Sequence, residues 1–123
     1  MTRQIKLATA FATLLIAGPL CSLLAHTCHV SCPSPEGACV GGTGSVEVNC
    51  AGGSCTITAT LNAAGSHNST TAVRPSTNTA SITVCVPPGG YDCCMVVSLK
   101  PDCDWGDIGA GKCSCLLVEC VHG

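Results

Sequence analysis

Apolar and polar residues alternate along several stretches of this chain, which is the pattern of half-buried β-strands. In residues 45–50, Val46, Val48 and Cys50 fall on one face. After a turn at residues 51–54, residues 55–61 place the odd-numbered side chains on one face and a row of threonines on the other. These two runs predict a β-hairpin whose apolar faces point toward a core.

A second pair of runs follows further along the chain. Residues 80–86 alternate with Ile82, Val84 and Val86 on one face, and residues 93–99 form another apolar run after a turn at residues 87–92. Residues 113–121 are the last apolar run, and their valines, leucines and cysteines favour a strand over a short helix. Five predicted strands with hairpin connections indicate an all-β fold, a small antiparallel β-sheet or sandwich.

Three segments between these runs are predicted to be loops. Residues 26–43 are loop-like because prolines and glycines are spread among their cysteines. Residues 62–79, rich in Ser, Thr, Asn and Gly, predict a long exposed loop with a short strand at residues 71–73. Residues 100–112 form the third loop, with Pro101 and three glycines.

The N-terminus has the three parts of a secretory signal peptide. Arg3 and Lys6 precede an apolar run at residues 7–17, and a small residue, Ala25, precedes the expected cut. We therefore expect a signal peptide at residues 1–25 and a disulfide-rich domain at residues 26–123, secreted to the extracellular space and without a transmembrane segment in the mature chain. Cleavage after Ser22 is the second choice, and retention of the segment as a membrane anchor is the alternative.

Cysteine is unusually abundant, with 13 residues in 123, which is typical of a disulfide scaffold. Cys21 lies in the expected signal peptide, and an even set of twelve remains, enough for six bridges. The exported part has one Trp and one Tyr, so its core is thin, and each bridge adds about 2–4 kcal/mol of stability. The twelve predicted disulfide cysteines are Cys28, Cys32, Cys39, Cys50, Cys55, Cys85, Cys93, Cys94, Cys103, Cys113, Cys115 and Cys120.

The cysteine positions limit the pairing without fixing it. Cys50 and Cys55 flank the first predicted turn, so they can bridge across it or reach elsewhere. Cys93 and Cys94 should bond different partners because neighbouring side chains on a strand point to opposite faces. By the same rule, Cys113 and Cys115 should share a face.

Charge and motifs exclude several functional classes. After Ala25 the chain carries three basic and seven acidic residues, a net charge of −4, which repels nucleic acid. It contains neither the G-x-S-x-G nor the H-E-x-x-H motif, and even pairing leaves no spare thiol for a nucleophile. The sequence therefore predicts a non-enzymatic protein, and we expect no cofactor.

Two groups of residues are candidate metal ligands. His26, at the new N-terminus after the expected cut, offers an α-amine and an imidazole to copper, and His29 can add a nitrogen. Asp102, Asp104 and Asp107 form an acidic loop that can hold calcium, although the EF-hand spacing fails. A frayed terminus and a solvated turn are the plain alternatives. Thiolate coordination is disfavoured because thiols oxidise outside the cell.

Two further residues have a predicted role. Asn68 begins an Asn-Ser-Thr triplet that fits the N-glycosylation pattern in a eukaryotic host. Trp105 is expected to be tucked onto the sheet because the core contains few other large side chains.

These observations predict the function only as a class. We expect a secreted cysteine-rich protein, either a surface or matrix component or a binding module, whose partner is another extracellular protein or surface. Its loops at residues 62–79 and 100–112 would carry recognition. The alternatives are a secreted effector, toxin or inhibitor, and an extracellular metal-binding protein that uses the copper or calcium residues above.

Overall fold

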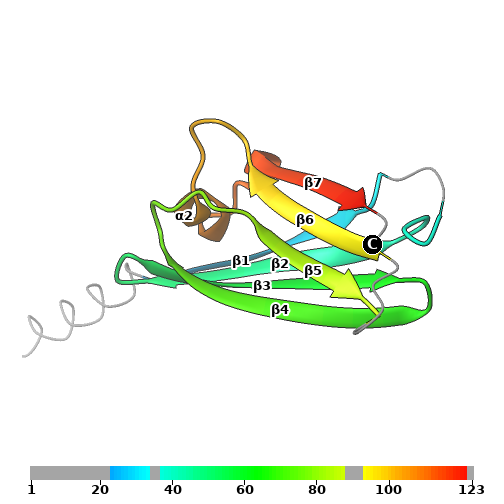
Figure 1. The fold of residues 1–123 in the computed structure, drawn as a ribbon. Helices are drawn as coiled ribbons and strands as arrows, with labels where there is room; N and C mark the ends of the chain where they lie inside the picture. Colours follow the sequence, from blue (N-terminus) through cyan, green and yellow to red (C-terminus); the bar gives the residue numbers. More distant parts are fainter. Residues whose placement is uncertain (1–22, 34–36, 88–92, 122–123) are drawn as a thin grey trace, which may run out of the picture.

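The protein is described by a computed structural model that covers residues 23–33, 37–87 and 93–121. Within these residues, seven strands form two antiparallel sheets (Figure 1). The four-stranded sheet has the order β1-β2-β3-β4, and its strands are β1 (Leu23–Ser31), β2 (Thr43–Ala51), β3 (Ser54–Ala63) and β4 (Ser66–Pro75). The three-stranded sheet consists of β5 (Ile82–Val86), β6 (Cys93–Leu99) and β7 (Leu116–Val121).

Two short helical elements lie between β6 and β7: the helix α2 (Trp105–Gly109) and the 3-10 turn η1 (Cys113–Cys115). No helix in the described part of the chain is long and apolar enough to cross a bilayer.

Both predicted hairpins are confirmed. Strand β2 pairs with β3 so that Val48 lies opposite Ile57, and both side chains are fully buried. In the second hairpin Val84 of β5 lies opposite Met95 of β6, and both are buried. The alternation in the sequence predicted these strands because one face of each strand is buried and the other is exposed to solvent.

A single buried cluster joins the inner faces of the two sheets. Figure 1 shows the three-stranded sheet lying over the four-stranded one, and Met95 of β6 packs directly above Gly44 of β2. A Cβ atom at Gly44 would overlap the carbonyl oxygen of Thr60 and come within 3.2 Å of the Met95 side chain. The sheets approach closely at this point because residue 44 has no side chain.

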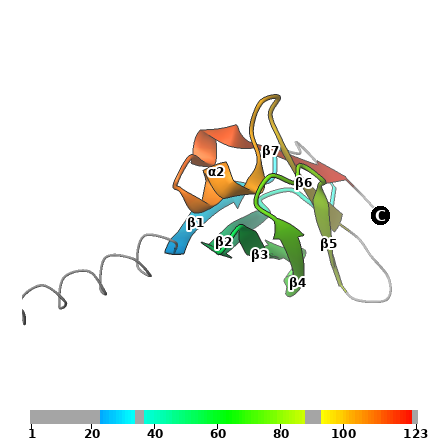
Figure 2. The same cartoon turned by 90° about the vertical axis from the view of Figure 1, so that its left-hand side faces the viewer.

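Helix α2 covers the part of the four-stranded sheet nearest β1 and β2 (Figure 2). Its Trp105 and Ile108 are fully buried, and the Trp105 indole N–H donates to the carbonyl oxygen of Ala80 at 3.0 Å. The prediction that Trp105 is tucked into the core is confirmed. A Cβ atom at Gly109 would lie 2.7 Å from the Cys50 sulfur, so the helix also sits tightly on the β2–β3 hairpin.

All twelve predicted cysteines form disulfides. Cys93 and Cys94 bond different partners, as expected for neighbours on a strand, and Cys50 bridges the first turn to Cys55. Three bridges span 54 to 88 residues and join the N-terminal segment to the second half of the chain. The six pairs are Cys28–Cys113, Cys32–Cys120, Cys39–Cys93, Cys50–Cys55, Cys85–Cys94 and Cys103–Cys115.

The loop predicted at residues 26–43 is wrong for its first part, because β1 runs to Ser31. This edge strand needs little apolar sequence. Cys28 is buried and disulfide-bonded, Val30 is half-buried, and the backbone pairs with β2 along nine residues. Residues 23–25 belong to β1, so a cut after Ala25 would remove three paired residues, whereas a cut after Ser22 would leave the strand whole. The remainder of the predicted signal peptide, residues 1–22, lies outside the described residues.

The long loop predicted at residues 62–79 is also wrong, because β4 occupies most of it. Its outward side chains are wet, and its inward side chains, such as Asn68 and Arg74, are only half-buried at the sheet edge. Backbone pairing with β3 over ten residues stabilises this strand, and no hydrophobic period marks it.

Two smaller expectations fail near the C-terminal end. The predicted loop at residues 100–112 contains α2, which begins at the N-cap Asp104. Cys113 and Cys115 do not share a strand face, since they lie in η1 and bond Cys28 and Cys103. The strand predicted from residue 113 begins at Leu116.

Candidate functional site

The predicted copper ligands do not come together on β1. His26 and His29 are three residues apart on one strand, so their side chains point to opposite faces. The imidazole of His26 lies on the inner side, where a Cβ atom at Gly111 would be 3.7 Å from its ring, whereas His29 is exposed on the outer side.

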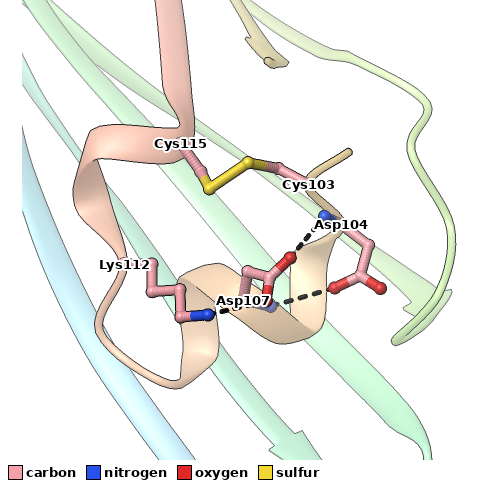
Figure 3. Close-up of polar contacts among 5 residues, drawn as sticks. All are labelled: Cys103, Asp104, Asp107, Lys112 and Cys115. Atoms are coloured by element: carbon pink, nitrogen blue, oxygen red, sulfur yellow. Dashed lines mark hydrogen bonds and ion pairs between the residues drawn. A yellow bond between two sulfur atoms is a disulfide. The ribbon is translucent and has the colours of Figure 1, made fainter. Parts of the chain in front are cut away.

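The acidic loop is used for helix capping (Figure 3). The Asp104 carboxylate accepts from the Asp107 backbone N–H at 3.0 Å, and the Asp107 carboxylate accepts from the Asp104 N–H at 2.9 Å. This reciprocal pair is a capping box. No group of three potential ligand atoms in the described residues combines Asp102, Asp104 and Asp107, so their carboxylates do not converge on one point, and calcium binding stays a prediction.

Asp107 is held in its charged form by these contacts. The hydrogen bond from the Asp104 backbone lowers the pKa of the Asp107 carboxyl below its ordinary value of 3.8, and burial opposes this shift. Lys112 adds a smaller attraction, with its Nζ 3.6 Å from the carboxylate. The charge therefore serves the local fold.

Sulfur atoms dominate the clusters that could hold a metal. Each of the three clusters in the described residues contains a disulfide: Cys28–Cys113 beside His26, Cys32–Cys120 beside Cys93, and Cys103–Cys115 beside Asp107. Cys93 is itself bonded to Cys39. Because a metal binds the thiolate form of cysteine, these oxidised sulfurs offer no thiolate ligands.

Asn68 faces the second sheet. Its side-chain amide nitrogen donates to the carbonyl oxygen of Cys85 on β5 at 2.9 Å. A glycan attached to this nitrogen would have to break or rearrange that bond, so glycosylation of Asn68 stays a prediction.

Polar side chains cover most of the outer face of the four-stranded sheet, and we call this surface the hydroxyl face. Cross-strand register places the outward side chains in ranks, and we define the hydroxyl face as the four ranks from Ala25 to Ser31 of β1, sixteen positions in all, without the end rank of Leu23, Ala51, Ser54 and Pro75. Nine carry hydroxyls, Glu47 is the only carboxylate, and there is no lysine or arginine among them. The members are Ala25, Thr27, His29 and Ser31; Thr43, Ser45, Glu47 and Asn49; Thr56, Thr58, Thr60 and Asn62; and His67, Ser69, Thr71 and Val73.

Neighbouring hydroxyls on this face bond one another. The Thr58 and Thr71 oxygens are 3.1 Å apart, and the Thr60 and Ser69 oxygens are 2.9 Å apart. Sheet geometry repeats such groups at about 4.8 Å across the strands and about 6.7 Å along them. The hydroxyls therefore form a regular, mutually oriented array.

A hollow of about 380 Å³ lies at one end of the hydroxyl face. Its walls include Thr43, Asn62 and His67, which are cross-strand neighbours on β2, β3 and β4. The β3–β4 turn forms its rim, with Ala64 at φ 52° and Gly65 at φ 76°. Two successive residues with positive φ are typical of the tight turns that suit the twist of a hairpin.

The outer face of the three-stranded sheet is different, and we call its apolar part the apolar patch. Val96, Leu117, Val121 and the Cys85–Cys94 disulfide lie on this side. Leu117 is 44 % exposed and Val121 is 40 % exposed, with Glu119 between them on β7.

Sequence reasoning missed the hydroxyl face as a site. The threonine row of β3 was visible in the sequence. Because β4 was predicted as a loop, its side chains could not be aligned beside that row. The available signal was weak: Ser69 and Thr71 stand two positions apart between His67 and Val73, and Thr70 interrupts the alternation. Comparison of this chain with family models, with curated proteins and with solved structures found no match.

Proposed function

We propose that the chain acts outside the cell as a non-enzymatic binding module, a disulfide-braced β-sandwich that attaches through the hydroxyl face to an extracellular surface. The observation that carries the proposal is the pair of hydroxyl ranks on β3 and β4, whose oxygens bond one another on a face with one carboxylate among its sixteen positions. Low charge alone does not distinguish this face, because only 10 % of the residues in the chain are charged. Ordered hydroxyls with little charge among them favour contact with a hydrogen-bonding surface.

The bridges support an extracellular site of action. Six disulfides form and persist in an oxidising compartment, where they replace the large core that the chain lacks. A rigid scaffold loses little backbone entropy when it binds a partner. The short Ser and Thr side chains on its surface also have few rotamers to lose.

A sedimentation experiment tests this function. The full chain is expressed in a secreting host, and the released protein is mixed with insoluble wall or matrix material from the producing cells. The double variant Thr58→Lys/Thr71→Lys places two charges at the centre of the hydroxyl face, and Thr83→Lys, an exposed outward position on β5, is the matched control. We expect the wild type and the control to sediment and the double variant to stay in solution. Equal behaviour of all three would contradict the function.

The apolar patch favours a second candidate, an effector or inhibitor that binds a protein. Exposed aliphatic side chains around a charged centre fit a small protein interface better than a hydrated surface. Leu117→Ser/Val121→Ser should abolish binding to a protein target and leave sedimentation with matrix material unchanged. Loss of both activities, or of neither, would argue against a separate role for the patch.

A further inference from the structure

We propose that the hydroxyl face binds an uncharged polysaccharide, with the polymer extended over the threonine ranks of β3 and β4 and one end of the contact in the hollow. This inference rests on the proposed function and names the ligand class for the same surface. Neutrality, hydrogen-bonding capacity and shape each support it.

Neutrality limits the ligand. Glu47 is the only carboxylate on the face, and no lysine or arginine stands among its sixteen positions. Phosphate groups, nucleic acids and acidic sugars need cationic partners, and basic peptides need several carboxylates. An uncharged ligand loses none of these contacts and brings no ion of its own to be desolvated.

Hydrogen bonding selects a polyol among uncharged ligands. A threonine or serine hydroxyl donates one proton and accepts through two lone pairs, and a sugar hydroxyl has the same capacity. The Thr58–Thr71 and Thr60–Ser69 bonds orient neighbouring hydroxyls and leave acceptor and donor positions for a ligand on the outer side. Each such bond contributes only about 0.5–1.5 kcal/mol net.

Weak single contacts make a polymer the fitting ligand. Affinity accumulates when one ligand spans several ranks at once, whereas a lone sugar unit reaches one or two. The face also lacks the aromatic platforms that hold single sugars by stacking, since Trp105 is buried in the core. We therefore expect retention on polysaccharide chains or particles and little affinity for monosaccharides.

The hollow gives the face a distinct end. Its volume of about 380 Å³ is in the range of small-molecule sites, and Asn62 and His67 face each other across β3 and β4 at its wall. An amide and an imidazole supply directional donors and acceptors that the flat ranks lack. In this proposal the end of the polymer lies in the hollow, which is open to solvent.

The test uses purified insoluble polysaccharides of stated composition: cellulose, chitin and a β-1,3-glucan. The disulfide-intact chain is incubated with each, and the bound fraction is measured from low salt to about 1 M NaCl. At least one polysaccharide should retain the wild type with little dependence on salt, because no charged groups mediate the contact. Thr58→Lys/Thr71→Lys should lower the apparent affinity about tenfold or more, and Thr83→Lys should not change it.

The hollow is tested separately with Asn62→Ala/His67→Ala, which should weaken retention less than the lysine pair and leave salt dependence unchanged. Circular dichroism and intact mass without reductant confirm that each variant is folded with six bridges.

Other outcomes overturn the inference. If matrix material retains the protein and all three polysaccharides fail, the ligand class is wrong while the proposed function stands. If neither retains it, both fail. A concentration-dependent dimer that the lysine pair dissociates would assign the face to a second copy. Thermal hysteresis of freezing without polysaccharide binding would assign it to an ordered water surface.

Discussion

The two sheets of this protein differ in size, in bracing and in what their outer faces present. The four-stranded sheet has strands of nine or ten residues and contains one bridge, Cys50–Cys55, within a hairpin. The three-stranded sheet has strands of five to seven residues and likewise contains one hairpin bridge, Cys85–Cys94, and Cys93 and Cys120 anchor it to the N-terminal segment. The long sheet has the longer backbone ladders, and we expect the short sheet to depend more on its cross-links.

The outer faces follow the same division. The hydroxyl face is wide, polar and nearly uncharged, and the apolar patch is small and centred on β7. A large hydroxyl array interacts by many weak contacts, and a small aliphatic patch interacts by desolvation. The comparison indicates that one chain carries two chemically distinct surfaces on a common core. Five changes test how the two sheets are braced, packed and closed.

Removal of two inter-segment bridges should have the largest effect. Cys28–Cys113 and Cys32–Cys120 join the same two segments, so deleting one leaves the other to close the loop. Replacing all four cysteines with alanine should lower the free energy of unfolding by about 6 kcal/mol, a large part of the stability of a small domain. Urea denaturation without reductant measures this loss.

The matched control is the hairpin bridge. Cys50→Ala/Cys55→Ala removes a more deeply buried pair that closes only five residues, and it should cost about 2 kcal/mol. Equal losses in the two variants would show that the bridges between distant segments stabilise the fold no more than the hairpin bridge within the long sheet.

A side chain added in the narrow space between the sheets should have the next largest effect on stability. In Gly44→Ala the new methyl group would overlap the Thr60 carbonyl and press on Met95, so β2 and β3 or the sheets themselves must move apart. We expect a loss of about 2–3 kcal/mol in the free energy of unfolding. Ser45→Ala, at the next position and on the outer face, should change it by less than about 0.5 kcal/mol. A tolerated alanine at residue 44 would mean that the sheets are not in close contact there.

The sequence predicted the parts of the fold in which one side of a strand is dry. Val46, Val48, Ile57 and Val84 alternate with polar residues because burial imposes a period of two. It did not predict β1 and β4, the two edges of the long sheet. Their inward side chains are only partly buried or are cystine, so no period is required of them.

The hydroxyl face could not be found from the sequence for a related reason. The hydroxyl face exists only when Ser69 and Thr71 of β4 align beside Thr58 and Thr60 of β3, and that alignment is set by backbone register. The acidic loop shows that one spacing of residues can serve two purposes. Asp104 and Asp107 have a spacing that suits a cation, but the same spacing suits a capping box, and the free N–H groups of α2 are the nearer partners.

Substitutions in the cap of α2 test how firmly this helix is held over the four-stranded sheet. Asp104→Ala removes the acceptor for the Asp107 N–H and should cost about 1 kcal/mol in the free energy of unfolding.

Asp107 adds a pH dependence to the stability of the fold. Its folded pKa is lowered, chiefly by the Asp104 backbone N–H, so the charged carboxylate stabilises the fold above the unfolded value of about 3.9.

That contribution is lost as the pH falls through the lowered folded pKa. The stability difference between wild type and Asp107→Asn should therefore be constant at neutral pH and shrink progressively from about pH 5 downward. Urea denaturation at a series of pH values measures it. A difference that is independent of pH would show that the charge of Asp107 contributes nothing to the cap.

The smallest effect is expected at the rim of the hollow, where Ala64 has φ 52°. The left-handed region costs an alanine about 1 kcal/mol, and asparagine tolerates it better. Ala64→Asn should therefore raise the free energy of unfolding by about 0.5 kcal/mol, because an Asn-Gly pair is the preferred sequence for this turn. Thr58 lies far along the ladder from residue 64, so retention through the centre of the hydroxyl face should be unchanged. If the variant is instead less stable, the turn does not adopt this geometry, and the hollow that it borders must have a different shape.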